Sequence, residues 1–171
     1  MFHLILVILA ITVCYFVGDW RNWTKYHSTI LFYITGDLMY NFLAYNKPLW
    51  QYASHTTWLG HTLSNLLVSL TVFPCTILVF FRYYPNSGIL KKIVYISLWV
   101  AIQSSVEAVS LRLGYFTHHN NWNIVWSIIA NFILFPTMVL HQSKPLWAYI
   151  TYGATAIIML LIFGIQLSDF K

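Results

Sequence analysis

Six long apolar runs, separated by short polar stretches, constrain the fold of this chain more than any other feature. They cover Phe2–Gly18, Ser28–Tyr45, His61–Phe81, Ile93–Leu113, Trp122–Leu140 and Leu146–Gln166. A helix rises about 1.5 Å per residue, so about 20 apolar residues cross the hydrocarbon core of a bilayer. Lipid offers the backbone no hydrogen-bond partners, which favours helices, and a barrel would alternate polar and apolar residues instead. The sequence therefore predicts an all-α, polytopic membrane helical bundle of about six transmembrane helices, forming one domain over residues 1–171.

The composition supports the same class of protein. Hydrophobic residues make up 59% of the chain and charged residues only 8%, whereas a soluble domain carries about 25% charged residues. The nine Lys and Arg residues are scattered, which excludes a nucleic-acid-binding surface. The sequence has no phosphate-binding glycine loop, nucleotide fingerprint or serine nucleophile elbow. It therefore points to no particular cofactor, and the cofactors stay unknown. We expect the lipid bilayer as its partner and the cell membrane, crossed several times, as its location.

The distribution of basic residues predicts an orientation. Six lie after the first, third and fifth runs and three on the opposite side, namely Arg21, Lys25, Arg82, Lys91, Lys92 and Lys144 against Lys47, Arg112 and Lys171. Cytoplasmic loops carry the excess of Lys and Arg, so both termini are predicted to be extracytoplasmic. The first of these loops, "DWRNWTKYH", mixes basic and aromatic residues, and we interpret it as an interfacial turn on anionic lipid.

Each of the four middle runs carries one polar stripe at helical spacing. The stripes are Tyr33, Asp37, Tyr40 and Asn41; His61, Ser64 and Asn65; Gln103, Ser104, Glu107 and Ser110; and Asn123, Ser127 and Asn131. Lipid cannot hydrogen-bond such side chains, so we expect the stripes to face one another. The first and sixth runs have no charge in their interiors and should pack on the outside.

Two acids lie within the apolar runs, and they are the main functional candidates. A charge at the centre of a spanning helix costs roughly 2.5–3.5 kcal/mol on insertion scales. An acid placed there in spite of this cost indicates a functional role. Asp37 and Glu107 are predicted to exchange a proton or bind a small ion or solute, supported by four amide side chains, Asn41, Asn65, Gln103 and Asn131. Arg112 lies nearly opposite Glu107 on the helix, so we expect His61, Asn65 or Asp37 to be the partners of Glu107. The alternative is that both acids only make hydrogen bonds that fix helix register.

The histidines raise a second hypothesis. His118 and His119 are adjacent in a polar loop, and His61 opens the third run. Together with Glu107 they predict, at most, a zinc or manganese site. No HExxH or HxxxH spacing is present, and solvated interfacial histidines are the alternative interpretation.

The two halves of the middle region resemble each other. "TGDLMYNFLAY" and "SVEAVSLRLGY" align without gaps and match Asp37 with Glu107. Each is followed by a loop and by a run that contains Phe-Pro, at Pro74 and Pro136. The second and third runs and the fourth and fifth runs are therefore hypothesised to be parallel repeats, as in some transporters. Each proline is expected to kink its helix.

Three strings also carry a resemblance to a known family. "GDLMYNFLAYNKPLW", "FPCT" and "LGYFTHHNNWNIVWS" resemble a small family of integral membrane proteins from spore-forming Gram-positive bacteria. The resemblance implies a multi-helix plasma-membrane protein and implies no activity or site residue.

The leading functional expectation is therefore a membrane protein that handles or senses a small solute, ion or proton, as a homo-oligomer or with a membrane partner. The alternatives are a membrane-embedded metal-dependent hydrolase or lipid-modifying enzyme, and a non-catalytic envelope scaffold that binds through "NKPLWQYASHTTWLG".

Overall fold

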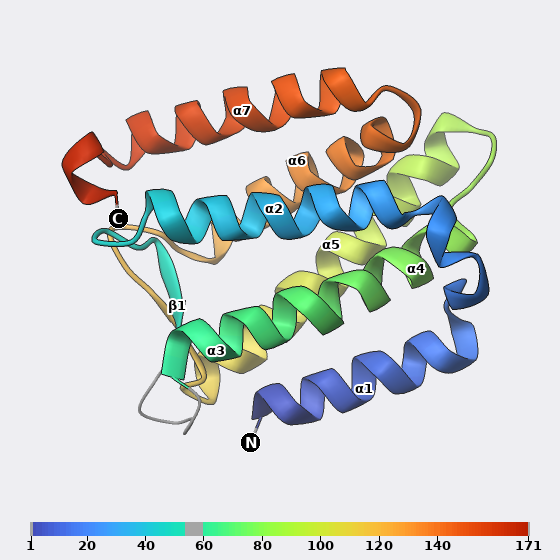
Figure 1. Ribbon diagram of the computed structural model, residues 1–171, viewed down its shortest axis with the longest axis horizontal. Helices are drawn as coiled ribbons and strands as arrows, with labels where there is room; N and C mark the ends of the chain where they lie inside the picture. The colour runs from blue at the N-terminus through green and yellow to red at the C-terminus, as the bar shows by residue number, and fades with distance from the viewer. Residues whose placement is uncertain (1, 54–59, 171) are drawn as a thin grey trace.

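The computed structural model describes residues 2–53 and 60–170 and is built almost entirely from helices (Figure 1). The α-helices in this part are α1 (Phe2–Val17), α2 (His27–Leu43), α3 (Gly60–Leu67), α4 (Phe73–Tyr83), α5 (Ile89–Arg112), α6 (Ile124–Ser143) and α7 (Pro145–Ile162). Shorter turns are the 3-10 helices η1 (Trp20–Lys25) and η4 (Leu167–Asp169) and the π-helical segment η3 (Val68–Val72). The predicted all-α class is thus confirmed, apart from two short strands described below.

Among the described residues, four helices are long and apolar enough to cross a membrane. They are α5, α6, α7 and the continuous helix Gly60–Tyr83, which joins α3, η3 and α4. α1 and α2 are shorter, at 16 and 17 residues. Six crossings therefore stay a prediction, because two of the six predicted segments fall below the length of a full span.

The helices lie alongside one another, with α7 at one edge and α1 at the opposite edge (Figure 1). α1 packs on η3 and α4, and α7 packs on α6. α2 lies between these edges and contacts both α4 and α6. The two uncharged helices thus occupy outer positions, as their composition predicts.

An aromatic cluster forms the centre of the bundle. Phe80 is fully buried and packs against Tyr95, Trp99 and Phe135. The Tyr95 hydroxyl also donates to the Phe80 carbonyl at 2.8 Å.

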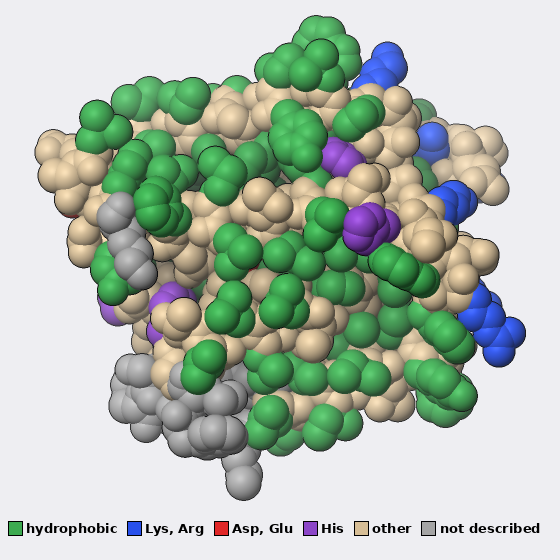
Figure 2. Space-filling model, in the orientation of Figure 1, with side chains coloured by type: hydrophobic (Ala, Val, Ile, Leu, Met, Phe, Trp, Pro, Cys, Tyr) green, Lys and Arg blue, Asp and Glu red, His purple; other side chains and the backbone are tan. Residues whose placement is uncertain are grey.

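Large apolar side chains also cover the outside of the molecule (Figure 2), with Leu161 on α7 75% exposed. An apolar exterior around a packed core suits a lipid environment.

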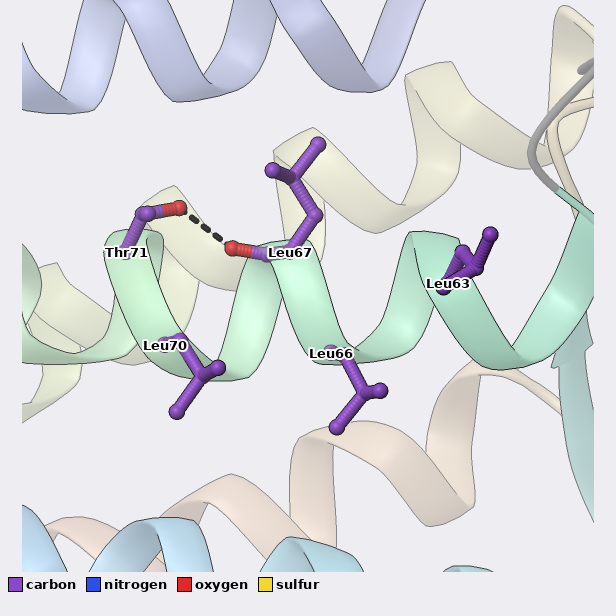
Figure 3. Close-up of a pocket in the computed structure, with 5 residues that line it drawn as sticks. All are labelled: Leu63, Leu66, Leu67, Leu70 and Thr71. Atoms are coloured by element: carbon purple, nitrogen blue, oxygen red, sulfur yellow. Dashed lines mark hydrogen bonds between the residues drawn. The ribbon is translucent and has the colours of Figure 1, made fainter.

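The two prolines do not distort their helices alike. Pro74 follows the π turn, in which the Phe73 amide donates to the Val68 carbonyl. The Thr71 hydroxyl also donates to the Leu67 carbonyl (Figure 3). Pro136 lies inside α6, which stays α-helical across it. A departure from α-helical geometry thus precedes Pro74 alone of the two prolines, as a π turn next to a residue that lacks an N–H, and the kink expected at each proline stays a prediction.

A small antiparallel sheet, which the sequence analysis missed, joins two loops at one end of the bundle. β1 (Trp50–Tyr52) follows α2, β2 (Phe116–His118) follows α5, and Trp50 pairs with His118. Trp50 also stacks on Tyr40 and Phe116, with ring centroids 4.7 Å and 5.4 Å apart. Strands of three residues are too short to show an alternating pattern. Residues 54–59 of the predicted scaffold loop lie outside the described residues.

Candidate functional site

Asp37 lies on α2 and is hydrogen-bonded to the next helix in the chain. Its Oδ2 accepts from Asn65 Nδ2 at 2.8 Å and from the Ser69 hydroxyl at 2.6 Å. Both donors are neutral, and within residues 2–53 and 60–170 no Lys, Arg or His forms an ion pair with Asp37. The expectation that this acid faces a polar stripe of a neighbouring helix is met by α3 and η3.

Asn65 places a side-chain oxygen atom close to the Asp37 carboxyl, and within residues 2–53 and 60–170 this atom has no hydrogen-bond partner. The side chain is 3% exposed, and its Nδ2 is used by Asp37. Its Oδ1 is buried and accepts no hydrogen bond in the described part of the molecule. Buried acceptors are nearly always satisfied, so this oxygen calls for a donor or a cation. The Asn65 oxygen and the Asp37 carboxyl together form an oxygen-rich spot beside α2.

Asn41 and His61 connect this spot to the sheet. Asn41 Nδ2 donates to the Asp37 backbone carbonyl at 2.8 Å, and its Oδ1 lies 3.2 Å from His61 Nε2. The Tyr52 backbone N–H donates to His61 Nδ1 at 3.1 Å. Nδ1 therefore accepts, and Nε2 carries the proton donated to Asn41. His61 is thus a neutral bridge between β1 and α2.

Glu107 has different partners from those that the sequence analysis expected. Its Oε1 accepts from the Ser127 hydroxyl of α6 at 2.5 Å and pairs with His118 Nε2 of β2 at 2.8 Å. Ser127 also accepts from Trp122 Nε1 at 2.8 Å. The predicted partners on the second and third runs are wrong, because β2 turns back over α5 and brings His118 to the acid. The side chains of Glu107 and His118 are 13% and 14% exposed, so this pair lies near the end of the bundle.

The hypothetical metal site does not assemble in the described residues. Those residues contain no group of three or more His, Cys, Asp and Glu side chains that could hold a metal ion. His118 is paired with Glu107 and both ring nitrogens of His61 are engaged, whereas His119 is exposed and bonds to Thr117 at 2.9 Å. These histidines point to separate neighbours because each is fixed by a different backbone or side-chain partner.

Two predicted supporting residues, Gln103 and Asn131, make no hydrogen bond to either acid within the described residues. Gln103 is partly buried on α5, and Asn131 is 8% exposed on α6. Ser69 and Tyr52 were not predicted from the sequence, and Ser127 was predicted only as a member of a polar stripe. Ser69 follows Asn65 by four residues, a spacing that could have signalled one helix face.

Tyr52 of β1 connects the two acids electrostatically. Burial raises the pKa of its phenol, and the charges of Asp37 and Glu107 raise that pKa further. Both carboxyl groups therefore act on one side chain of the sheet.

The two acids also share a pattern of contacts. Asn65 lies nine residues before Pro74, and Ser127 lies nine residues before Pro136. Each of these side chains donates to the acid of the preceding long helix.

Two hollows on the surface lie away from the acids. One is an apolar depression on α3 and η3 lined by Leu63, Leu66, Leu67, Leu70 and Thr71 (Figure 3). Its only polar side chain, Thr71, is already bonded to the Leu67 carbonyl. The other hollow is polar and lies at the opposite end of the bundle from the sheet, between η1 and the end of α4.

No protein-family model matches the chain, and neither a curated protein nor a solved structure is similar enough to indicate a relationship. The family resemblance carried by "GDLMYNFLAYNKPLW" and the other strings therefore stays a prediction.

Proposed function

We propose that this protein is an integral membrane protein that handles protons or a small monovalent cation through Asp37 and Glu107. The observation that supports this most is the buried Asn65 Oδ1 beside the Asp37 carboxyl, which has no hydrogen-bond partner among the described residues. Carboxylate and amide oxygens are hard ligands that suit small cations, and a protonated carboxyl could also supply the missing donor. Either occupant neutralises an acid whose bonded partners carry no charge.

The Glu107–His118 pair provides an exchange point closer to water. It lies at the sheet-covered end of the bundle, where both side chains keep some exposure. An imidazole and a carboxyl group can each bind a proton, so the pair offers a place where a proton is held between the interior and water. The charges of both acids act on Tyr52. A change in charge at one acid therefore alters the electrostatic potential at a side chain that the other acid also affects.

The proposed architecture has six crossings, both termini outside the cytoplasm and two parallel repeats. The shared position of Asn65 and Ser127 relative to the following prolines supports the repeats. A bundle of 171 residues would form a pathway most readily as a homodimer or with a membrane partner. The resemblance to a plasma-membrane family of Gram-positive bacteria agrees with this location.

Flux measurements in proteoliposomes test the proposal. Protein reconstituted in vesicles with an internal pH dye is exposed to a pH step and, separately, to a gradient of sodium or potassium ions. We expect Asp37→Asn and Glu107→Gln each to abolish the response. Asp169→Asn, which removes an acid that caps η4 outside the interior, should keep it. Equal flux in wild type and both interior variants would contradict the proposal.

A further inference from the structure

A basic hollow lies at the end of the bundle away from the sheet. It is formed where α1 ends, where η1 turns and where α4 ends, and its volume is about 640 Å³. This volume is in the range of ligand pockets. The lining residues that matter are Tyr15, Phe16, Asp19, Arg21, Lys25 and Arg82. Figure 2 shows Lys and Arg side chains gathered at this end, on the right of the view.

Contacts between distant segments hold the walls of the basic hollow in place. Arg82 Nη1 donates to the Gly18 carbonyl at 2.8 Å, and the Asp19 amide donates to the Leu78 carbonyl at 3.2 Å. Tyr26 stacks on Phe81 with ring centroids 5.3 Å apart. These contacts fix η1 against α4, so the hollow is a built feature of the fold.

The positive charge of the basic hollow exceeds the negative charge of its one described carboxylate. Asp19 is the one acid among its lining residues, and its two carboxylate oxygens accept from Asn22 at 2.8 Å and Tyr26 at 3.1 Å. In residues 2–53 and 60–170, the only ion pair is Glu107–His118, so neither Arg21 nor Lys25 is paired with a carboxylate. Three cationic side chains that face one engaged acid favour an anionic ligand.

An apolar and aromatic surface adjoins this charge. Tyr15 and Phe16 at the end of α1 are 63% and 72% exposed, and Trp20 and Trp23 are 40% and 49% exposed. Aromatic residues of this kind favour the headgroup layer of a membrane. Arg21 lies over the Trp20 ring and Lys25 over the Tyr26 ring, at 5.4 Å and 5.2 Å, which holds both cations at this boundary. A ligand that fits has an anionic group next to an apolar chain.

We propose that the basic hollow binds the phosphate of an anionic glycerophospholipid, with Arg21, Lys25 and Arg82 around the phosphate and the acyl chains along Tyr15 and Phe16. Arginine and lysine bind phosphate by charge-assisted hydrogen bonds. Phosphatidylglycerol carries a net negative charge, whereas phosphatidylcholine carries the same phosphate with a compensating ammonium group. The basic hollow should therefore select the first lipid over the second.

Native mass spectrometry of the full chain, released from a neutral detergent, tests this proposal. The protein is titrated with phosphatidylglycerol, with phosphatidylcholine and with inorganic phosphate. We expect one equivalent of phosphatidylglycerol to bind about tenfold or more tightly than phosphatidylcholine. The double variant Arg21→Gln, Lys25→Gln should lose about tenfold in affinity for phosphatidylglycerol, because it removes two of the three cations around the phosphate. A tenfold loss corresponds to about 1.4 kcal/mol of binding free energy. The charge-preserving pair Arg21→Lys, Lys25→Arg should retain most of it.

A matched control removes the same charge at the same end of the bundle. Lys91→Gln, Lys144→Gln changes two cations that do not line the basic hollow, so its affinity should equal that of wild type. Equal losses in the two double variants would overturn the proposal, as would equal binding of the two lipids. If inorganic phosphate displaces phosphatidylglycerol at equal concentration, the acyl chains contribute nothing, and the lipid assignment is overturned in favour of a free phosphate.

Discussion

At the scale of single residues, the two interior acids are held by different kinds of hydrogen-bond partner. Asp37 is bonded by neutral donors from one neighbouring helix, whereas Glu107 is bonded by a hydroxyl and paired with a histidine. The two other acids, Asp19 and Asp169, lie in turns. The neutral surroundings of Asp37 make it the more sensitive of the two interior acids to loss of a donor.

Replacing Ser69 tests how much these donors matter. Ser69→Ala removes the 2.6 Å hydrogen bond to Asp37 and leaves the acid one donor. Leaving a charged group short of a partner costs about 1–3 kcal/mol, so the melting temperature in detergent should fall. Ser105→Ala is the matched control, because the exposed Ser105 hydroxyl bonds only to its own helix at Ala101. Equal melting temperatures for the two variants would contradict this role of Ser69.

Tyr52 gives a pH-dependent prediction. Its pKa is raised in the folded protein, mainly by burial, whereas an unfolded tyrosine ionises near pH 10. Because the raised pKa favours the neutral phenol, the stability from neutral Tyr52 is full below about pH 10 and is lost as the pH rises further. The melting temperature of wild type should therefore fall more steeply between about pH 10 and 11 than that of Tyr52→Phe. Parallel curves for the two proteins would show that Tyr52 ionises freely.

At the scale of secondary-structure elements, one close contact holds α7 against α2. A Cβ atom added to Gly36 would lie 2.9 Å from Tyr152 Cζ, and the Tyr152 hydroxyl donates to the Gly36 carbonyl at 2.6 Å. Phe32 packs against Tyr152 as well, with ring centroids 5.6 Å apart. The absence of a side chain at Gly36 is what lets the two helices meet here.

Gly36→Ala should therefore displace Tyr152 and break its hydrogen bond. We expect a loss of about 1–2 kcal/mol in unfolding free energy, measured by denaturation in detergent. Gly153→Ala on α7 is the control, since a Cβ there meets no atom within 4 Å and alanine favours helices. In a Tyr152→Phe background the cost of Gly36→Ala should shrink, because the hydrogen bond is already gone. A cost that is the same in both backgrounds would contradict this explanation.

The elements differ in how far sequence alone could predict them. Apolar runs and helical spacing are local patterns in the sequence, so the helices and the expectation that their polar stripes face one another could be predicted. The sheet did not, because Trp50 and His118 are brought together by two loops that share no local pattern. The same sheet brings His118 to Glu107. The partner of Glu107 therefore could not be predicted from how deep each residue lies along its helix.

At the scale of the whole molecule, the exposed apolar surface and the separation of charge agree with a membrane protein. Of the nine Lys and Arg residues, six lie in or beside the turns at one end, where α1, α4 and α6 finish. The sheet lies at the other end (Figure 1) and brings His118 to Glu107 there. This arrangement predicts which end of the bundle faces the cytoplasm.

Reporter fusions test that orientation. Asn86, between α4 and α5, should report a cytoplasmic location, and Asn120, between α5 and α6, an extracytoplasmic one. A further pair at Lys25 and Asn46 asks whether the 17-residue helix α2 crosses the membrane, and we expect these reporters to lie on opposite sides. Reports of one side from Lys25 and Asn46 would reduce the number of crossings below six.

The most direct test of the proposed function is to measure proton binding by the interior carboxyl groups. Infrared difference spectra of reconstituted protein, recorded across a pH step, show the carbonyl band of each carboxyl group that changes its protonation. We predict two such bands in wild type, one missing in Asp37→Asn and the other missing in Glu107→Gln, with both present in Asp169→Asn. Spectra in which neither interior variant removes a band would contradict the proposal that these acids exchange protons.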